Sequence, residues 1–464
     1  MIAVLGSAER PLRVAIVGSG PAGFYAAAQL LSSKDPVVSV DVYDRLMTPW
    51  GLVRFGVAPD HPKIKSVTRV FEKTARLPGF RFHGNVEIGA DVSHEELAAA
   101  YHAVLYAVGT PGDRHLSIDG EDLPGSESAT EFVAWYNGHP DYADMDFDLS
   151  CKRAVVIGNG NVALDVARML ALSVEELQTT DIADHAIELL RESNIEEIVV
   201  LGRRGPVQAA FTNPELRELR DLQLADVIVD ADDVALDPAS AAALADADAT
   251  TQRNVETLTE YSGLTPNGKP RRVVLRFLAS PVAIEGDGRV RALVVERNEL
   301  VQTEDGSLKA RPTGRRERLE TGLVLRAVGY VGKPLPGVPF DHRRNTVLNR
   351  DGRVLDPDTQ APVPGLYAAG WIKRGPTGVI GTNKKDAQET TSHLLADFAA
   401  GLLPEPSDTP DALLARLREQ GVNVIDYSGW EAIDAHERAL GEPHGRPRVK
   451  LVRREEQLKR ADVA

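Results

Sequence analysis

The sequence predicts an α/β fold with two parallel β-sheets, and three observations support this prediction. Two short apolar strands each run into a glycine-rich turn and then into a helix, with the turns at 18–23 and 158–163. Further apolar strand segments alternate with helical ones, which is typical of parallel sheets with helices on their faces. The chain has 464 residues, too many for one ordinary core, so we expect two domains.

The strands and helices can be assigned along the chain. In the first unit a strand at 13–17 precedes the turn and a helix follows at 24–31. In the second unit a strand at 153–157 precedes the turn, a helix follows at 164–172, and a further helical excursion is expected at 175–192. Other buried strands are expected at 37–43, 103–107, 198–201, 273–278, 323–328 and 366–369.

Three segments are interpreted as irregular or exposed. Residues 230–249 are rich in Asp and Ala, show no clear helical or two-residue periodicity, and are interpreted as an insertion or linker. Residues 403–410 are proline-rich and predict a loop. The tail at 436–460 carries many Arg and Lys residues, which we interpret as a solvated face that ends in an exposed helix.

The composition excludes several classes of protein. An apolar share of 43% and a charged share of 26% are typical of globular proteins. No apolar run approaches the roughly 20 residues that a membrane-spanning helix requires, so we expect no membrane association. The N-terminus runs directly into the first strand pattern, so we expect no cleavable signal and a cytoplasmic location.

Cysteine content and net charge exclude further classes of protein. The single Cys151 excludes an intramolecular disulfide, a Cys-x-x-Cys redox pair and a cysteine-ligated iron–sulfur cluster, and we expect it to be a small residue at a strand edge. The formal charge of -15 argues against general nucleic-acid binding. It also means that an acidic protein partner would need a local basic patch on which to dock.

The first glycine turn has the features of a dinucleotide site. Gly18, Gly20 and Gly23 fit the pattern G-x-G-x-x-G, in which the glycines permit a tight turn, close approach of a pyrophosphate, and close packing of helix on strand. Asp44 ends the next strand, where a carboxylate suits the two ribose hydroxyls of an adenosine. An acid at this position repels a 2′-phosphate, so the predicted ligand is FAD or NAD rather than NADP.

The second glycine turn is followed by cations instead of an acid. Gly158, Gly160 and Ala163 fit the same pattern, and Arg203 and Arg204 follow the next strand. Guanidinium groups can pair bidentately with a phosphate, so this turn predicts an NADP(H) site. The alternative is that both arginines are solvated loop charges. Together the two turns indicate a flavin in one site and NADPH in the other, with the flavin accepting hydride and releasing single electrons.

Six segments also carry a resemblance to a known family: TPWGLVR (48–54), VAPDHPK (57–63), VIGNGNVALD (156–165), GRRG (202–205), GWIKRGPTGVIGTN (370–383) and GEPHGRPRVK (441–450). They resemble the adrenodoxin-reductase-type ferredoxin–NADP+ reductases, especially the bacterial members. The resemblance implies a glutathione-reductase-like fold in which an NADP domain at 113–330 is inserted into an FAD domain. That FAD domain would be split into 1–112 and 331–464, the second part including the C-terminal tail.

The resemblance also implies residue roles. Residues expected around FAD are Gly18, Gly20, Pro21, Ala22, Gly23, Asp44, Leu52, Val86, Trp371, Gly378, Val379 and Ile380. Residues expected around NADP are Arg114, Asn159, Gly160, Asn161, Val162, Arg203, Arg204, Glu215 and Gly378. The helix after 377–380 could aim its N-terminus at the flavin edge where negative charge grows on reduction.

His61 and Glu215 are the residues that the resemblance places on either side of the hydride-transfer position. From the residues alone, His61 would be an exposed histidine in a loop that precedes a proline. Glu215 follows Thr-Asn-Pro near the start of a helix, where an acid is ordinary capping chemistry. Whether either residue relays protons or only positions the nicotinamide stays open at this stage.

The resemblance implies a monomeric ferredoxin–NADP+ reductase that exchanges single electrons with a ferredoxin-like iron–sulfur protein. Rival interpretations are a flavoprotein related to the glutamate synthase small subunit and a non-enzymatic NADP(H)-binding redox sensor. A disulfide reductase is excluded by the single cysteine. An acidic ferredoxin would need a positive surface, for which the candidates are Lys63, Lys65, Arg69, Arg217, Arg220, Lys373, Arg374, Lys384 and Lys385.

Overall fold

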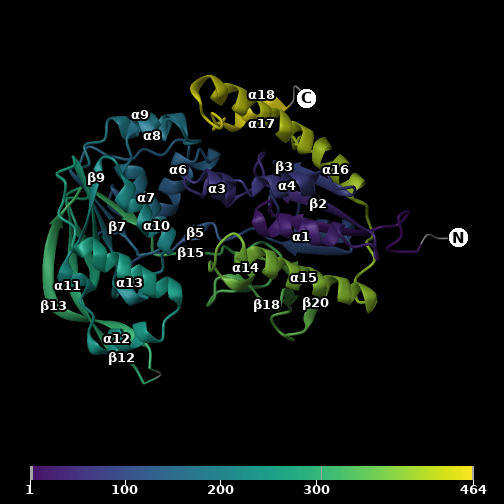
Figure 1. The fold of residues 1–464 in the computed structure, drawn as a ribbon. Helices are drawn as coiled ribbons and strands as arrows, with labels where there is room; N and C mark the ends of the chain where they lie inside the picture. The colour runs from purple at the N-terminus through teal and green to yellow at the C-terminus, as the bar shows by residue number, and fades with distance from the viewer. Residues whose placement is uncertain (1–3, 305, 462–464) are drawn as a thin grey trace.

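The computed structural model, which describes residues 4–304 and 306–461, contains two main sheets (Figure 1). The seven-stranded sheet has the order β18-β19-β20-β4-β1-β2-β3 and takes its strands from both ends of the chain. Its strands are β1 (Leu12–Val17), β2 (Val38–Asp44), β3 (Phe80–Gly84), β4 (Ala103–Tyr106), β18 (Asn349–Arg350), β19 (Arg353–Leu355) and β20 (Pro362–Ala368). In this sheet β18 pairs antiparallel with β19, and β19 with β20, while the other neighbouring strands are parallel.

The six-stranded sheet is built from the middle of the chain and is parallel throughout. Its order is β6-β14-β7-β8-β10-β9. Its strands are β6 (Ser126–Ser128), β7 (Arg153–Ile157), β8 (Glu197–Leu201), β9 (Ala225–Val229), β10 (Arg271–Arg276) and β14 (Leu323–Arg326). The two sheets give the predicted fold, in which one dinucleotide-binding unit is inserted into another.

The chain crosses between the two sheets at neighbouring points. On the outward path lies β5 (Gly112–Asp113) and on the return path β15 (Tyr330–Val331), and these two short strands pair antiparallel. Figure 1 shows both of them in the middle of the molecule, between its two lobes. The predicted domain limits at 112/113 and 330/331 remain predictions about where the folding units divide.

Helices cover both faces of the seven-stranded sheet. One face packs against α1 (Pro21–Leu31), α15 (Thr382–Ala399) and α17 (Tyr427–Gly441). The other face packs against α5 (His94–Ala100) and α16 (Pro410–Glu419). The remaining helices of this lobe are α2 (Leu52–Phe55), α3 (Pro62–Lys65), α4 (Thr68–Ala75), α14 (Trp371–Arg374) and α18 (Arg454–Ala461).

The six-stranded sheet has helices on one face only, which differs from the prediction. Alternate strand residues such as Val156 and Val200 pack against the helices, whereas Val155 and Val199 pack against a three-stranded antiparallel sheet. That sheet contains β11 (Ala279–Glu285), β12 (Ala292–Gln302) and β13 (Leu308–Glu320). The helices of this lobe are α6 (Ala129–Tyr136), α7 (Asn161–Ala171), α8 (Val174–Leu177), α9 (Asp184–Arg191), α10 (Asn213–Glu218), α11 (Ala231–Val234), α12 (Pro238–Ala245) and α13 (Ala249–Ser262).

The predicted strands are confirmed with shifts of a few residues at their ends, and α8 and α9 confirm the helical excursion. The interpretation of 230–249 as irregular is wrong. Three helices start in this segment, and Asp230, Asp237 and Asp248 are their N-caps, each accepting a backbone N–H of the first turn. The proline-rich segment does form a loop over 403–409, and its last residue, Pro410, begins α16.

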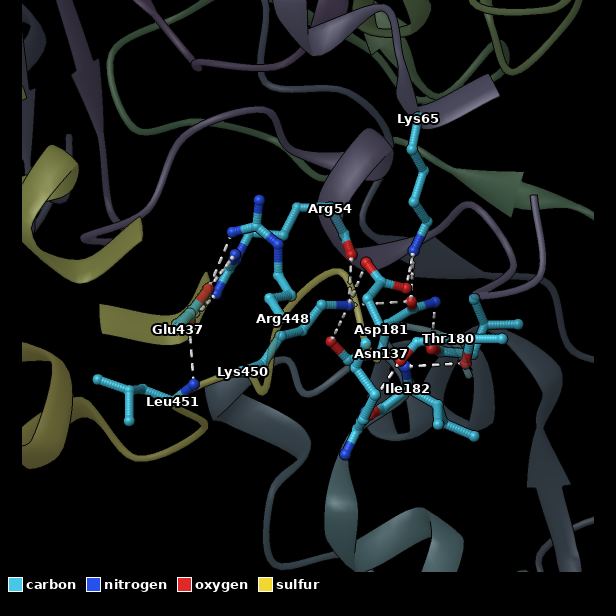
Figure 2. A network of polar contacts seen from close by, with 12 residues as sticks. Arg54, Lys65, Asn137, Thr180, Asp181, Ile182, Glu437, Arg448, Lys450 and Leu451 are labelled. Atoms are coloured by element: carbon cyan, nitrogen blue, oxygen red, sulfur yellow. Dashed lines mark hydrogen bonds and ion pairs between the residues drawn. The ribbon is translucent and has the colours of Figure 1, made fainter. Parts of the chain in front are cut away.

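The interpretation of the basic tail as a solvated face is wrong for its middle part. Between α17 and α18 the chain passes over the junction of the two lobes, and Arg448 and Lys450 are buried there. Figure 2 shows the buried ion cluster that results. Its members are Arg54, Lys65, Asn137, Asp181, Glu437, Arg448 and Lys450.

The buried ion cluster ties three parts of the chain together. The Lys450 Nζ atom donates to the backbone oxygens of Asn137 at 3.0 Å and Arg54 at 3.2 Å, and lies 3.3 Å from the Asp181 carboxylate. The Lys65 Nζ atom lies 2.6 Å from the other Asp181 oxygen. Burial lowers the pKa of Lys450 well below its ordinary value. A cation at such a depth is tolerated only with anionic partners, so Asp181 has a structural role.

Candidate functional site

The first glycine turn has the geometry that its pattern predicts. Gly18 has a φ of +106°, and a Cβ there would lie 2.5 Å from the Ala107 carbonyl oxygen. A Cβ on Gly23 would lie 2.0 Å from the Gly18 carbonyl oxygen, so helix and strand pack too closely for a side chain. A Cβ on Gly20 would meet no atom of the described chain within 4 Å. The backbone at the start of α1, at Pro21, is therefore open to an anionic ligand.

Asp44 lies at the turn, as predicted, and also holds the turn in place. One carboxylate oxygen accepts the Ser19 N–H at 2.8 Å and the Ser19 hydroxyl at 2.5 Å. The other accepts the Leu46 N–H at 2.9 Å. The N–H of the buried Val86 donates to the Asp44 carbonyl oxygen at 2.9 Å, which brings Val86 beside the same edge of the sheet. The contact of Asp44 with a ribose remains a prediction.

Two distant segments come together at this turn. Leu52 begins α2 directly after Gly51, where a Cβ would lie 3.0 Å from the Gly20 Cα atom. From the other end of the chain, a Cβ on Gly370 would lie 2.6 Å from the Cβ of Ala22. Residues expected at FAD thus converge here from the first and last parts of the sequence.

The segment at 370–383 lies beside the first glycine turn. The Trp371 ring lies 5.3 Å from that of Tyr330, and its Nε1 donates to the Thr377 carbonyl oxygen at 3.2 Å. Gly378 has a φ of +78°, and Val379 is 59% exposed. Ile380 is half-buried against the core, and α15 begins two residues later.

The second glycine turn has a backbone geometry similar to that of the first. Gly158 has a φ of +144°, and a Cβ there would lie 2.3 Å from the Ala327 carbonyl oxygen, whereas a Cβ on Gly160 would find no neighbour within 4 Å in the described part of the protein. The Asn159 carbonyl oxygen accepts the Ala210 N–H at 2.9 Å, and the Asn161 side chain accepts the Thr212 N–H at 2.8 Å. These bonds join the turn, with Val162 in its first helical residues, to the segment that leads into α10.

Arg203 and Arg204 follow β8 with their guanidinium groups unpaired. Neither side chain has a hydrogen-bond or ion-pair partner within residues 4–304 and 306–461. The backbone is nevertheless fixed, because the Arg203 carbonyl oxygen accepts the Asn298 amide at 2.8 Å and the Arg204 carbonyl oxygen accepts the Leu278 N–H at 3.1 Å. Two cations on an anchored loop fit a phosphate.

Arg114 lies on the crossover beside the same edge of the six-stranded sheet. Its N–H donates to the Gly329 carbonyl oxygen at 3.0 Å, shortly after β14 ends. Its side chain is exposed. Its predicted contact with NADP remains a prediction, as do those of the other residues named for this site.

His61 is buried, which contradicts the prediction from the residues alone. It precedes α3, is 9% exposed, and its Nε2 atom lies 2.9 Å from Glu218 Oε2. The resemblance places His61 and Glu215 on either side of the hydride-transfer position. The direct hydrogen-bond partner of His61 is Glu218, one helical turn further along α10. Glu215 lies in the first turn of α10, as predicted, and its Oε2 atom is buried without a partner among the residues described.

Burial and charge shift the protonation of this site. Burial alone would lower the pKa of His61, but the hydrogen bond to Glu218 and the charges of Asp165 and Asp60 together outweigh it, so the net shift is upward. Burial raises the pKa of Asp165 to about 6, and the nearby Asp60 and Glu215 add to that rise. The site therefore contains two groups that can change protonation near neutral pH.

Sequence reasoning missed four residues of the two sites: Asp165, Arg168, Glu218 and Asp386. Glu218 is three residues after Glu215 and Arg168 three after Asp165, a spacing that puts each pair on one helix face. Asp386 on α15 accepts the N–H of Gly370 and lies 3.3 Å from the Lys373 Nζ atom. No local pattern marks these residues, because their partners are distant in the sequence.

Three of the nine residues predicted for the basic patch have partners within the chain. Lys65 is bound to Asp181, Lys373 pairs with Glu389 at 2.5 Å, and Arg374 bonds the Asn383 side chain at 2.9 Å, so these three are not available to a partner. The remaining six side chains are exposed: Lys63, Arg69, Arg217, Arg220, Lys384 and Lys385.

Two other features, a membrane-spanning helix and a metal centre, are absent from the described residues. These residues contain no helix long and apolar enough to cross a membrane. Nor do they contain a group of three or more His, Cys, Asp or Glu residues that could hold a metal ion.

The fold and the two glycine turns define a flavin- and pyridine-nucleotide-dependent oxidoreductase. A family model described as pyridine nucleotide-disulphide oxidoreductase matches residues 12–200. The chain is 51% identical over 449 residues to the NADPH-ferredoxin reductase FprA of Mycobacterium leprae. The match covers 94% of this chain and 96% of that protein. The chain is 45% identical over 470 residues to human mitochondrial NADPH:adrenodoxin oxidoreductase, covering 97% and 92% respectively.

A solved structure agrees with these relatives. The structure of Mycobacterium tuberculosis FprA in complex with NADPH matches with a TM-score of 0.92 and 49% identity, over 97% of this chain and 100% of that one. The chain belongs to the family of NADPH–ferredoxin and NADPH–adrenodoxin reductases. The resemblance and the fold class inferred from the sequence are thereby confirmed.

Proposed function

We propose that this chain is an NADPH–ferredoxin reductase that binds FAD at the first glycine turn and NADP(H) at the second. One observation carries the proposal: similar turns, each with an open central glycine, are followed by groups of opposite charge. Asp44 follows the first turn and disfavours a 2′-phosphate. Arg203 and Arg204 follow the second, unpaired within the described chain, and favour one.

The residues around the first turn fit FAD. The N–H groups at the start of α1 would bind the pyrophosphate, and Asp44 would bind the ribose hydroxyls. The buried Trp50 Nε1 and Thr48 hydroxyl, near the same turn, have no hydrogen-bond partner among the described residues. When bound, FAD supplies the chemistry of accepting two electrons as a hydride and releasing them singly.

The residues of the second unit bind and orient NADPH. Arg203 and Arg204 would hold the 2′-phosphate, and the N–H groups at Asn161 and Val162 the pyrophosphate. His61, paired with Glu218, and Glu215 would line the nicotinamide pocket. The upward shift in the pKa of His61 favours its protonated form, and as a member of this pocket it would lie near the nicotinamide.

The electron acceptor proposed here is an acidic ferredoxin-type iron–sulfur protein. The six exposed cations of the basic patch, from Lys63 to Lys385, offer it a positive surface on a chain whose formal charge is -15. Attraction of this kind raises the association rate and weakens with salt. The monomeric state and the cytoplasmic location stay predictions from the sequence.

The test has two stages. The purified protein should show a flavin spectrum that bleaches when NADPH is added under anaerobic conditions. Adding a ferredoxin should then support the reduction of cytochrome c. Bleaching without transfer to ferredoxin would favour a sensor, and a colourless protein that binds no flavin would refute the proposal.

A further inference from the structure

Arg168 is a buried arginine between the two dinucleotide units. It lies on α7, about two turns after the second glycine turn, and its side chain is 2% exposed. Its guanidinium lies among three carboxylates: Asp60 at 2.5 Å, Glu218 at 2.5 Å and Asp165 at 3.4 Å. Asp60 comes from the first part of the chain and the two other carboxylates come from the middle part.

Arg168 contacts both the chain neighbour of His61 and the hydrogen-bond partner of its ring. The Nη2 atom holds Asp60, the residue immediately before His61. The Nη1 atom holds Glu218 Oε2, the same oxygen that lies 2.9 Å from the His61 Nε2 atom. The side chain of the residue before His61 and the carboxylate that orients the imidazole are therefore bound to one rigid planar group.

The geometry requires a fork rather than a charge alone. A guanidinium donates in two fixed directions, so it can fix the distance between Asp60 and Glu218. A lysine ammonium in the same place is a point charge, and it would satisfy one carboxylate at a time. Neutralising the three acids would need only a positive charge, so rescue by lysine separates that function from positioning.

We propose that Arg168 is a positioning residue for hydride transfer, which holds His61 and Glu218 in register across the junction of the two dinucleotide units. The inference rests on the proposed function, because it concerns the same site. Arg168 acts through His61 and Glu218 and is not itself placed against the reacting atoms.

The electrostatics of the site give a second readout. The charged and titratable groups that face His61 are Asp60 in its own loop, Asp165 and Arg168 on α7, and Glu215 and Glu218 on α10. Among these, the positive charge of Arg168 lowers the pKa of His61, while the acids raise it. Removing the guanidinium should therefore move the pH profile of flavin reduction to higher pH.

The experiment is anaerobic single-turnover reduction of the flavin-loaded enzyme by NADPH, followed by absorbance across a pH series. R168M should lower the limiting rate by about 10- to 100-fold, because small misplacements of a reacting geometry have effects of this size. The NADPH concentration for half-maximal rate should change far less, since Arg203 and Arg204 are untouched. R168K should bring the pH profile back towards wild type without restoring the rate.

The matched control is R353M. Arg353 binds Asp397 with two hydrogen bonds of 2.8 Å at the far end of α15, so its loss removes a similar ion pair outside the site. The control should leave both the limiting rate and the pH profile unchanged. Equal rates in R168M and wild type would overturn the proposal, as would full recovery of the rate by R168K.

If R168M does not fold, a double-mutant cycle of R168K and E218Q tests the same proposal. If Arg168 acts through Glu218, the rate losses of R168K and E218Q should be far from additive, and additive losses would overturn the proposal. Failure of the wild-type enzyme to be reduced by NADPH would instead refute the proposed function. The two failures are thus distinguishable in one set of measurements.

Discussion

Replacing Arg203 and Arg204 by serine should abolish the preference for NADPH while leaving the fold intact. Their side chains have no partners in the described chain, and their loop is held by backbone bonds to Asn298 and Leu278. Substitution therefore removes charge without breaking a structural contact. This makes the pair a cleaner test of specificity than any buried residue of the site.

The magnitude follows from the contacts that would be lost. Hydrogen bonds to charged groups contribute about 1.5–3 kcal/mol each, and screening at an exposed site reduces their sum to about 2–4 kcal/mol. At about 1.4 kcal/mol for each factor of ten, kcat/KM for NADPH should fall by about 30- to 1000-fold. The value for NADH should change little, because NADH has no 2′-phosphate.

The assay is steady-state reduction of ferricyanide with each nucleotide, which bypasses ferredoxin docking. The matched control is R343S/R344S, which removes an adjacent pair of exposed arginines from the turn at 342–345. It should leave both kcat/KM values unchanged. If the R203S/R204S variant lost activity equally with NADPH and NADH, the assignment of the 2′-phosphate to this pair would be wrong.

Three further predictions concern stability and docking. D181N leaves Lys65 and Lys450 buried without their anion and should destabilise the protein by about 3–5 kcal/mol in thermal unfolding. D184N changes an exposed carboxylate whose partner Arg446 keeps its bonds to two backbone carbonyl oxygens, and should cost less than about 1 kcal/mol. Burial raises the pKa of Asp141 but Arg454 and Arg45 outweigh it and bring it to about 2. The stability from this group is present above pH ~4 and lost as the pH falls towards 2, so D141N should flatten the acid side of the Tm profile, and an unchanged slope would contradict the assignment. K384Q/K385Q should slow ferredoxin-dependent cytochrome c reduction and reduce its salt dependence, while K152Q should not, and equal salt profiles for all three proteins would exclude this part of the patch.

The sequence predicted the dinucleotide units because their signals are local. Each unit depends on residues close together in the chain, and Gly18 and Gly158 take positive φ values that their positions in the turns require. The helices between Asp230 and Asp248 were missed for a different reason. These helices are marked in the sequence by aspartate N-caps and not by apolar periodicity. In α12, for example, Ser240 is the buried residue, so the helix has no apolar face that a pattern could reveal.

The tail and the hydride-transfer site could not be predicted because their contacts are long-range. Lys450 contacts residues more than 250 positions away, and a charge run in sequence gives no sign that it will be buried. The exposure of His61 was misjudged for the same reason, since Glu218 and Arg168 enclose it only after the two units meet. Local patterns indicate which residues bind nucleotides, and tertiary packing decides which ones orient them.

Charge balance shows why the unpaired arginines are informative. The chain has 68 acidic and 53 basic residues, so a shortage of carboxylates does not leave an arginine without a partner. On nearby segments Arg316 pairs with Glu296 at 3.1 Å, and Arg297 pairs with Asp233. The loop after β8 holds two guanidinium groups away from every described carboxylate while fixing their backbone. Arg343 and Arg344 also lack a side-chain partner among the described residues, so the absence of a partner is not enough by itself. The position of Arg203 and Arg204, on an anchored loop after the second glycine turn, is what a phosphate ligand accounts for.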